Sequence, residues 1–147
     1  MDRRFVDAND DSRRQLAALI DRLGDEDLAR DLGDGWTVAA ALAHVAFWDR
    51  SAEARWERWR TDGSMEEFSN ALIDVVNAAN LPGWRALPPR VAADLARSAA
   101  EDLDARIANL PEDAVAFALA TDRSYLVDRS GHRLAHVRQI EDALAAG

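Results

Sequence analysis

The chain has 147 residues, 48% of them hydrophobic, and a formal net charge of −9 at pH 7. This length and composition favour one globular domain spanning residues 1–147. The excess of acidic groups repels polyanions, so we expect no nucleic-acid partner.

Cysteine is absent from the chain, which excludes disulfides and thiolate metal sites. No run approaches the roughly 18 apolar residues of a membrane span. The opening residues MDRRFVDANDDS lack the apolar stretch of a secretory signal. We therefore expect a cytoplasmic protein that does not enter a membrane.

The first predicted helix runs from about Asn9 to Leu23, because Leu16, Leu19 and Ile20 recur at helical spacing. Gly24 is predicted to end it. The acidic, glycine-containing segment 25–35 is expected to be a loop with at most one short turn.

A second, longer helix is predicted from Val38 to about Arg60, with Thr37 as its N-cap and Trp36 packing against Ala41 as a hydrophobic staple. Its first half is apolar nearly all round, so that half should be buried on several sides. Four arginines in the second half alternate with acids, which predicts a solvated face with acidic partners: Arg50, Arg55, Arg58 and Arg60.

Ser64 and Glu67 have the spacing of a capping box and predict a short third helix through Val76. Residues 81–84 (Leu-Pro-Gly-Trp) are expected to form a crossover loop. Pro88 and Pro89 suit the first turn of a fourth helix, which Pro111 ends.

The favoured last helix starts at the N-cap Thr121 and continues to the end of the chain. Gly131 inside it costs roughly 1 kcal/mol relative to alanine, so a start near Ser130 is the alternative. No convincing strand is present. Four long amphipathic helices and one short helix predict an all-α helical bundle, whose sites form between facing helices.

The chain has three histidines, at positions that suit a metal site. His132 and His136 are four residues apart and therefore share one helix face. His44 lies in the buried half of the second helix, where the simpler interpretation is a core histidine bonded to a carbonyl. Three imidazoles from two helices can instead hold a divalent metal and leave coordination positions open.

Two segments resemble the DinB/YfiT-like superfamily: residues 36–49 (WTVAAALAHVAFWD) and residues 132–140 (HRLAHVRQI). The resemblance implies a four-helix bundle with an up-down-down-up path and a short extra helix in the crossover. It also implies a divalent metal, zinc or nickel, bound by His44, His132 and His136. Related proteins include mycothiol-dependent maleylpyruvate isomerase, through its N-terminal domain, and bacillithiol transferases.

Three functional hypotheses follow from this site. The first is a transferase in which a low-molecular-weight thiol of the mycothiol or bacillithiol type binds the metal and attacks a small-molecule electrophile. The second is hydrolysis by metal-bound hydroxide. The third is a non-catalytic bundle with a vestigial site, in which Trp56 and Trp59 form a homodimer interface.

Further side chains near the histidines have two interpretations each. Asp49 can orient a histidine or an arginine of another helix, but a structural ion pair is the preferred interpretation. Gln139 can line the site or bond a neighbouring helix. Tyr125 can reach the cavity, although ordinary packing is preferred. The tryptophans, including Trp48 and Trp84, are expected in the core or at an interface.

Overall fold

The computed structural model describes all 147 residues, and apart from one small hairpin the chain is helical. This confirms the predicted all-α class. The elements in chain order are α1 (Arg4–Arg22), α2 (Asp25–Leu28), β1 (Asp31–Gly33), β2 (Trp36–Thr37), α3 (Val38–Asp62), α4 (Asn70–Ala86), α5 (Pro89–Ala108), α6 (Glu112–Ala120), a 3₁₀ turn η1 (Ser124–Leu126) and α7 (Ser130–Ala145).

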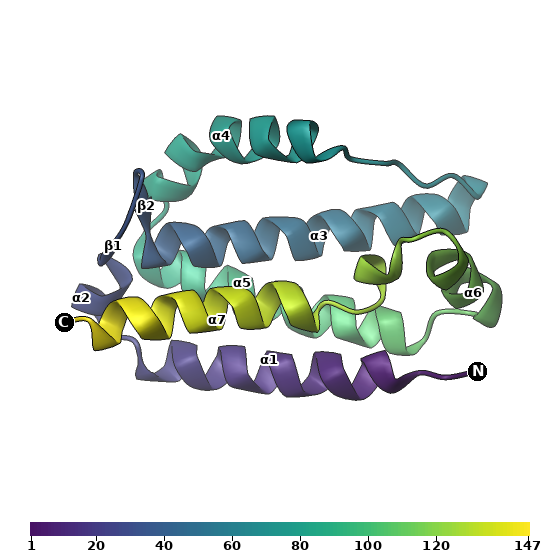
Figure 1. The fold of residues 1–147 in the computed structure, drawn as a ribbon, viewed down its shortest axis with the longest axis horizontal. Helices are drawn as coiled ribbons and strands as arrows, with labels where there is room; N and C mark the ends of the chain where they lie inside the picture. The colour runs from purple at the N-terminus through teal and green to yellow at the C-terminus, as the bar shows by residue number, and fades with distance from the viewer.

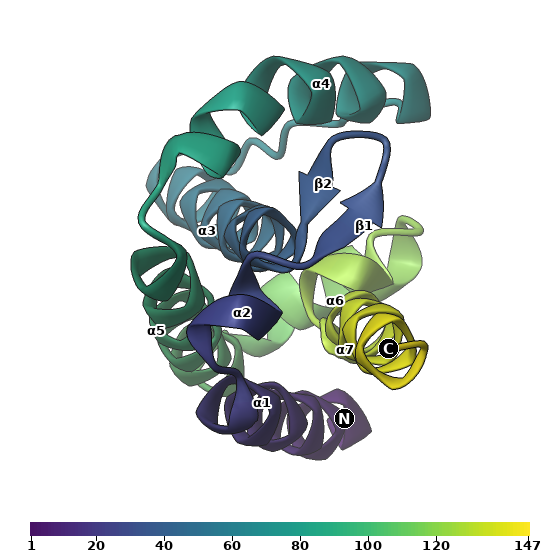
Figure 2. The same cartoon turned by 90° about the vertical axis from the view of Figure 1, so that its left-hand side faces the viewer.

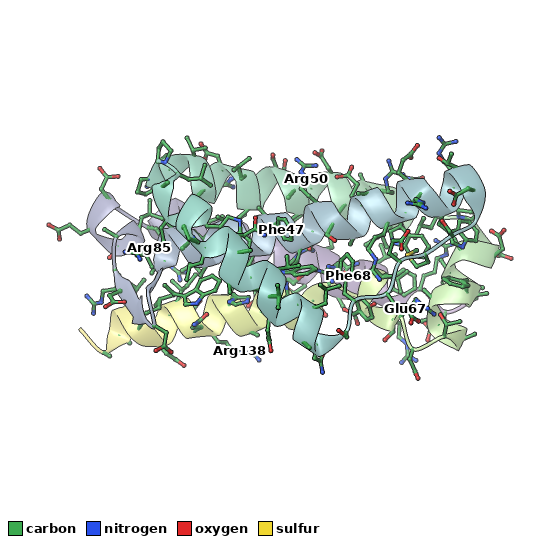
Figure 3. The ribbon with its side chains drawn as sticks, turned by 90° about the horizontal axis from the view of Figure 1, so that it is seen from above. Phe47, Arg50, Glu67, Phe68, Arg85 and Arg138 are labelled. Carbon is green, nitrogen blue, oxygen red and sulfur yellow. The ribbon has the colours of Figure 1, made fainter.

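Helices α1, α3, α5 and α7 lie side by side with their axes nearly aligned (Figure 1). α1 and α7 run in one direction, and α3 and α5 run in the other (Figure 1). α4 lies outside this group and crosses over it, with its N-terminal end on the α7 side and its C-terminal end on the α5 side (Figures 2 and 3). None of the helices combines the length and hydropathy that a membrane-spanning segment requires.

The most extensive helix packing is between α3 and α5. Small side chains make it possible, because two helix axes approach most closely where alanine faces alanine. Alanines are buried along both helices: Ala39, Ala43 and Ala46 on α3, and Ala92, Ala93, Ala96, Ala99 and Ala100 on α5. This packing fixes α3, which carries His44.

Two hydrophobic clusters form the core. One lies at the end where α3 begins and includes Leu16, Leu42 and Ile140. The other includes Trp56, which is 1% exposed and whose indole Nε1 donates to the Leu126 carbonyl at 2.9 Å. Trp59 packs against the same cluster. The predicted interface is therefore wrong for Trp56, which is not available to a partner.

A two-stranded antiparallel hairpin replaces the loop expected over residues 25–35, so the expectation of no strand is wrong. The connection turns tightly through Gly33, Asp34 and Gly35, which all have positive φ. Glycine adopts this conformation without strain and aspartate tolerates it. The four-residue helix α2 precedes the hairpin and corresponds to the one short turn expected in this segment.

Helices α1 and α3 agree with the prediction, with shifted ends. α1 begins at Arg4, five residues before the predicted start, and ends at Arg22. Thr37 caps α3, since its Oγ1 accepts from the Ala40 amide at 3.1 Å. α5 begins at Pro89 as predicted.

The prediction for the third helix is wrong at both ends. Ser69, not Ser64, is the N-cap, and its Oγ accepts from the Leu72 amide at 3.1 Å. Ser64 instead bonds Asp62. The helix also continues through Pro82 to Ala86, where a crossover loop was expected. A proline inside a helix loses one backbone hydrogen bond, and here the following turn is anchored by the buried side chain of Trp84.

The favoured start of the last helix is also wrong, and the alternative near Ser130 is confirmed. Asp122 has a φ of 56°, which interrupts any continuous helix from Thr121. Helix α6, which was not predicted, ends at Ala120 just before this point, and η1 follows it. Gly131 is therefore in the first turn of α7 and not in a helix interior.

Candidate metal centre

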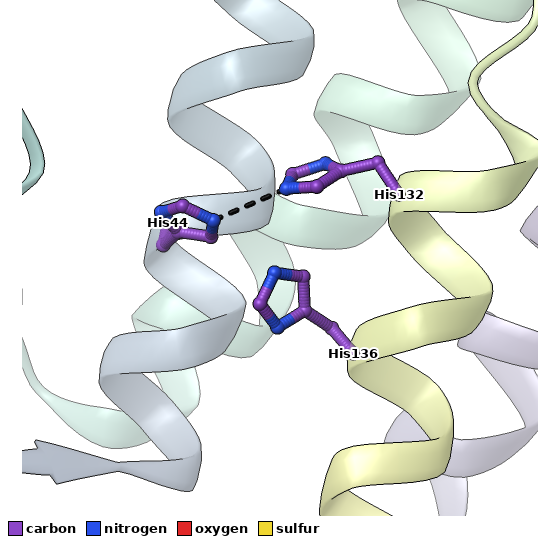
Figure 4. Close-up of side chains that lie close together, drawn as sticks. All are labelled: His44, His132 and His136. Atoms are coloured by element: carbon purple, nitrogen blue, oxygen red, sulfur yellow. Dashed lines mark hydrogen bonds between the residues drawn. The ribbon is translucent and has the colours of Figure 1, made fainter. Parts of the chain in front are cut away.

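The three histidines meet between α3 and α7 (Figure 4). One ring nitrogen from each lies within 4.8 Å of the others. The Nε2 atoms of His44 and His132 are 3.1 Å apart, and the ring centroids of His132 and His136 are 4.8 Å apart. The expectation that the two α7 histidines share a face directed at His44 is therefore confirmed, and His44 is not bonded to a backbone carbonyl.

Burial keeps all three imidazoles neutral near pH 7. It lowers the pKa of His44 to about 4 and that of His132 to about 2, and it also lowers the pKa of His136. The neighbouring histidines and Arg129 add to the effect at His132. A neutral imidazole has a free lone pair, which is the form that binds metals.

Gln139 controls the hydrogen position on one of the three rings. Its Oε1 lies 2.9 Å from His136 Nδ1 and accepts the Nδ1 hydrogen, which leaves the lone pair on His136 Nε2. Partners of this kind orient metal-ligating histidines in proteins. Gln139 therefore contacts the histidine group and does not bond a neighbouring helix, which corresponds to the first of its two interpretations. The Nδ1 atoms of His44 and His132 are buried without a hydrogen-bond partner.

Aromatic packing holds the His44 ring, whose Nδ1 has no hydrogen-bond partner. The rings of Trp36 and Trp84 lie at 5.4 and 5.5 Å from the His44 ring, both nearly perpendicular to it. Phe47 packs against Trp84 from the next turn of α3. The predicted core position of Trp84 is correct, and that position also makes it a wall of the histidine group.

A buried network of ion pairs fastens α7 to α3 and α5 beside the histidines. Asp49 is fully buried and accepts from Arg129 Nε at 2.9 Å and from Arg133 Nε at 3.0 Å. Arg133 is also fully buried and bonds both carboxylate oxygens of Asp104, at 2.8 and 3.0 Å. The preferred interpretation of Asp49 as a structural ion pair is confirmed. Since Arg133 is the neighbour of His132 in the chain, the network also sets the position of the histidines.

A pocket of about 350 Å³ opens from the histidine group toward the N-terminal end of α4. It contains no acidic side chain. Its lining residues are His44, Trp48, Ala52, Arg55, Phe68, Asn70, Ile73, Tyr125, Leu126, Arg129 and His132. Tyr125 therefore reaches the cavity, which was the less favoured of its two interpretations.

Arg55 contradicts the prediction of a solvated arginine face. Arg50, Arg58 and Arg60 do lie at the surface with acidic partners. Arg55 is only 7% exposed and has no acidic partner. The sequence does contain a signal for it: Arg55 is eleven residues after His44, which is about three helical turns and returns to the same helix face.

The donor set fits a divalent metal. Nitrogens bound to one zinc ion at about 2.05 Å in a tetrahedral arrangement are separated by about 3.3 Å, close to the 3.1 Å between His44 and His132. Three neutral nitrogen donors and no thiolate suit zinc, nickel or copper more than calcium or magnesium. The ring nitrogens of all three histidines lie within 4.8 Å of one another, and the pocket borders His44 and His132.

Fold and site together define a class: helical proteins with a group of three histidines held between two helices, suited to a metal ion. The family model described as "Mycothiol maleylpyruvate isomerase N-terminal domain" matches residues 10–142. The chain therefore belongs to this DinB-like helical family. Comparison with curated proteins and with solved structures gives no match.

Proposed function

We propose that His44, His132 and His136 bind one divalent metal ion, zinc or nickel, and that the chain is a metal-dependent enzyme. The observation that carries this proposal is the convergence of three neutral imidazoles from two helices within 4.8 Å, at one end of a pocket. A structural metal site in a protein is usually closed by four protein ligands, whereas three ligands leave a position for water or substrate.

The proposed fold is the DinB/YfiT-like four-helix bundle with an up-down-down-up path, formed as one domain by residues 1–147. Supporting it are the opposite directions of the pair α1 and α7 and the pair α3 and α5 (Figure 1). α4 is then the crossover helix between the two parallel central helices. At 17 residues it is longer than the short helix expected there.

The proposed reaction is a thiol-dependent group transfer, with a mycothiol- or bacillithiol-type thiol as cosubstrate and a small molecule as acceptor. The name of the matching family points to mycothiol. The chain has no cysteine, so a thiol nucleophile has to come from outside. A bound divalent metal would supply the Lewis acidity that holds a thiol as thiolate near neutral pH.

The protein's own residues hold and shield the reactants in this proposal. Trp48, Phe68 and Ile73 form apolar walls that exclude water from the acceptor. Trp48 is fixed by a hydrogen bond from its Nε1 to Asn77 Oδ1 of α4, at 2.8 Å. Gln139 accepts the Nδ1 hydrogen of His136, so the lone pair of His136 stays on Nε2.

Metal content tests the first part of the proposal. We expect close to one zinc or nickel per chain in protein purified without a histidine tag, measured by plasma mass spectrometry. His44→Ala and His136→Ala should abolish it, whereas Arg138→Ala, on the exposed side of α7, should not. Absence of bound metal after incubation with excess zinc and nickel would overturn the proposal.

A spectroscopic titration tests the thiol. Cobalt(II) replaces the native metal, and mycothiol and bacillithiol are added separately. A thiol that binds as thiolate produces a charge-transfer band in the near ultraviolet. If neither thiol changes the cobalt spectrum, the transferase reaction is excluded, and hydrolysis by the same metal site becomes the function to test.

A further inference from the structure

Arg55 is a buried cation whose charge the protein does not neutralise. Arg55 is 7% exposed, and none of its side-chain nitrogens contacts a carboxylate. The two other buried arginines differ, since Arg129 and Arg133 both pair with Asp49. In a chain where 27 acidic residues outnumber 18 arginines, this lack of an acidic partner is notable.

The hydrogen bonds of Arg55 leave donors free. Both bonds come from Nη2, one to the Glu66 carbonyl and one to the Tyr125 hydroxyl oxygen at 3.1 Å. Nε is buried without an acceptor, and Nη1 has none within the protein. An arginine that keeps its charge at all physiological pH values and is buried with free donors is strongly stabilised by an anion.

Two aromatic rings hold the guanidinium in place. Its Cζ lies 4.9 Å from the centroid of Phe68 and 5.5 Å from that of Tyr125. Such contacts attract a cation and restrict its rotation. Phe68 precedes Ser69, the N-cap of α4, and Figure 3 shows it near the start of this helix. The cation is thus fixed before any ligand arrives, which lowers the entropic cost of binding.

The rest of the pocket favours an anion with an apolar body. Asn70, the first residue of α4, lines the pocket. The positive end of the α4 dipole therefore lies beside the pocket. Ile73, Leu126 and Ala52 supply apolar surface to the same pocket. The eleven-residue separation of His44 and Arg55 corresponds to a rise of about 16 Å along α3. A ligand that contacts both ends is therefore elongated.

The structure assigns Arg55 as the recognition site for the carboxylate of an elongated, mostly apolar organic acid, bound in the pocket with its other end toward the three histidines. In the reaction proposed above, this acid is the acceptor substrate. Its role as a substrate rests on that proposed function. Binding of the acid itself depends on Arg55 and the pocket walls, and not on a metal.

A binding experiment on metal-free protein separates the two proposals. The probes are 4-phenylbutanoate and its neutral analogue 4-phenylbutanamide, and their binding is followed by the intrinsic tryptophan fluorescence, to which Trp48 in the pocket wall contributes, and by isothermal calorimetry. We expect the acid to bind about 10- to 100-fold more tightly than the amide, the range of one charge-assisted hydrogen bond. Arg55→Gln should reduce the affinity for the acid to that for the amide and leave the amide affinity unchanged.

Arg58→Gln is the matched control, because Arg58 is on the same helix but at the surface, with Asp62 and Glu66 as partners. It should not change either affinity. Equal affinity of the wild-type protein for acid and amide, or no binding of either at millimolar concentration, overturns the assignment. The acid–amide comparison needs no variant, so it stays decisive if Arg55→Gln fails to fold. If the wild-type protein binds the acid but no metal, only the metal proposal is contradicted.

Discussion

His136 Nδ1 lies 2.9 Å from Oε1 of Gln139, one helical turn further along α7. The two residues are on the same helix, so the bond forms wherever α7 forms. It fixes the tautomer of His136 locally, before the histidine meets its partners on the other helix. Local geometry and long-range packing therefore act on different parts of the same group of histidines.

Replacing Gln139 with leucine should weaken metal binding. Leucine has no acceptor, so the hydrogen of His136 is free to move to Nε2, and the ring is free to turn. We expect the zinc affinity to fall about 10- to 100-fold, the usual effect of losing such a partner. Competition with a chromophoric chelator measures the affinity. Arg138→Gln, one position earlier, serves as the control, and an unchanged affinity in Gln139→Leu would contradict the role given to Gln139.

Replacing Asp49 with asparagine should strongly destabilise the fold. The substitution removes the negative charge shared by Arg129 and Arg133, which are both buried. Breaking a buried ion pair on one side costs about 3–5 kcal/mol. Urea denaturation of metal-free protein measures the loss. Glu141→Gln disrupts only the exposed pair with Arg22 and should cost less than about 1 kcal/mol. Similar losses in the two variants would show that the network is not a major source of stability.

The stability of the metal-free protein should fall between pH 7 and pH 5. Burial places the pKa of His44 at about 4 and that of His132 at about 2, both below the ordinary value of 6.5. The unfolded chain therefore binds protons below pH 6.5 that the folded chain does not bind. The stabilising contribution is present above pH 6.5 and is lost as the pH falls toward the folded-state pKa, by about 1.4 kcal/mol per pH unit for each group.

His132→Gln provides the comparison for this pH dependence. The variant lacks one titrating group, so its unfolding free energy should fall less steeply between pH 6 and pH 4.5. We expect its slope to be smaller than that of the wild-type protein by about 1.4 kcal/mol per pH unit. Chemical denaturation at several pH values gives both slopes. Equal slopes for the two proteins would mean that the pKa of His132 is not lowered in the folded state.

Alanine should stabilise the chain at Gly131 and destabilise it at Gly63. A Cβ on Gly131 meets no atom within 4 Å, and its φ is not in the left-handed region. Gly131→Ala should therefore add roughly 0.5–1 kcal/mol. Gly63 ends α3 with a φ of 73°, which alanine adopts only at a cost of about 1–2 kcal/mol. Thermal unfolding followed by circular dichroism should show midpoint shifts of opposite sign.

The sequence contains the histidine site in recognisable form because two independent patterns coincide there. His132 and His136 have a helical spacing that does not depend on the rest of the fold. His44 follows Thr37, whose capping role is confirmed, so its place within the helix was predictable. That α3 and α7 face one another came from the family resemblance, because long-range packing leaves no short-range signal in a single chain.

The predictions from sequence that the structure contradicts failed for physical reasons as well. The start of α7 was misplaced because the helical period continues through the segment in which Asp122 has a positive φ. The capping-box spacing with Glu67 favoured Ser64 as the N-cap, whereas Ser69 has Leu72 at the corresponding position, and only the fold selects Ser69. Arg55 was assigned to the surface with its neighbours, since alternation with acids is the same for buried and exposed arginines. Its burial depends on Phe68 and Tyr125, which come from distant segments.

The crossing helix α4 buries only one of its side chains, Trp84, near its C-terminal end. Its N-terminal half supplies Asn70 and Ile73 to the pocket, whereas the core clusters and the histidines are built almost entirely by the other helices. Substitutions there alter the shape of the pocket at little cost in folding free energy. A change confined to this one helix can therefore reshape the pocket while the histidine group and the four aligned helices stay as they are.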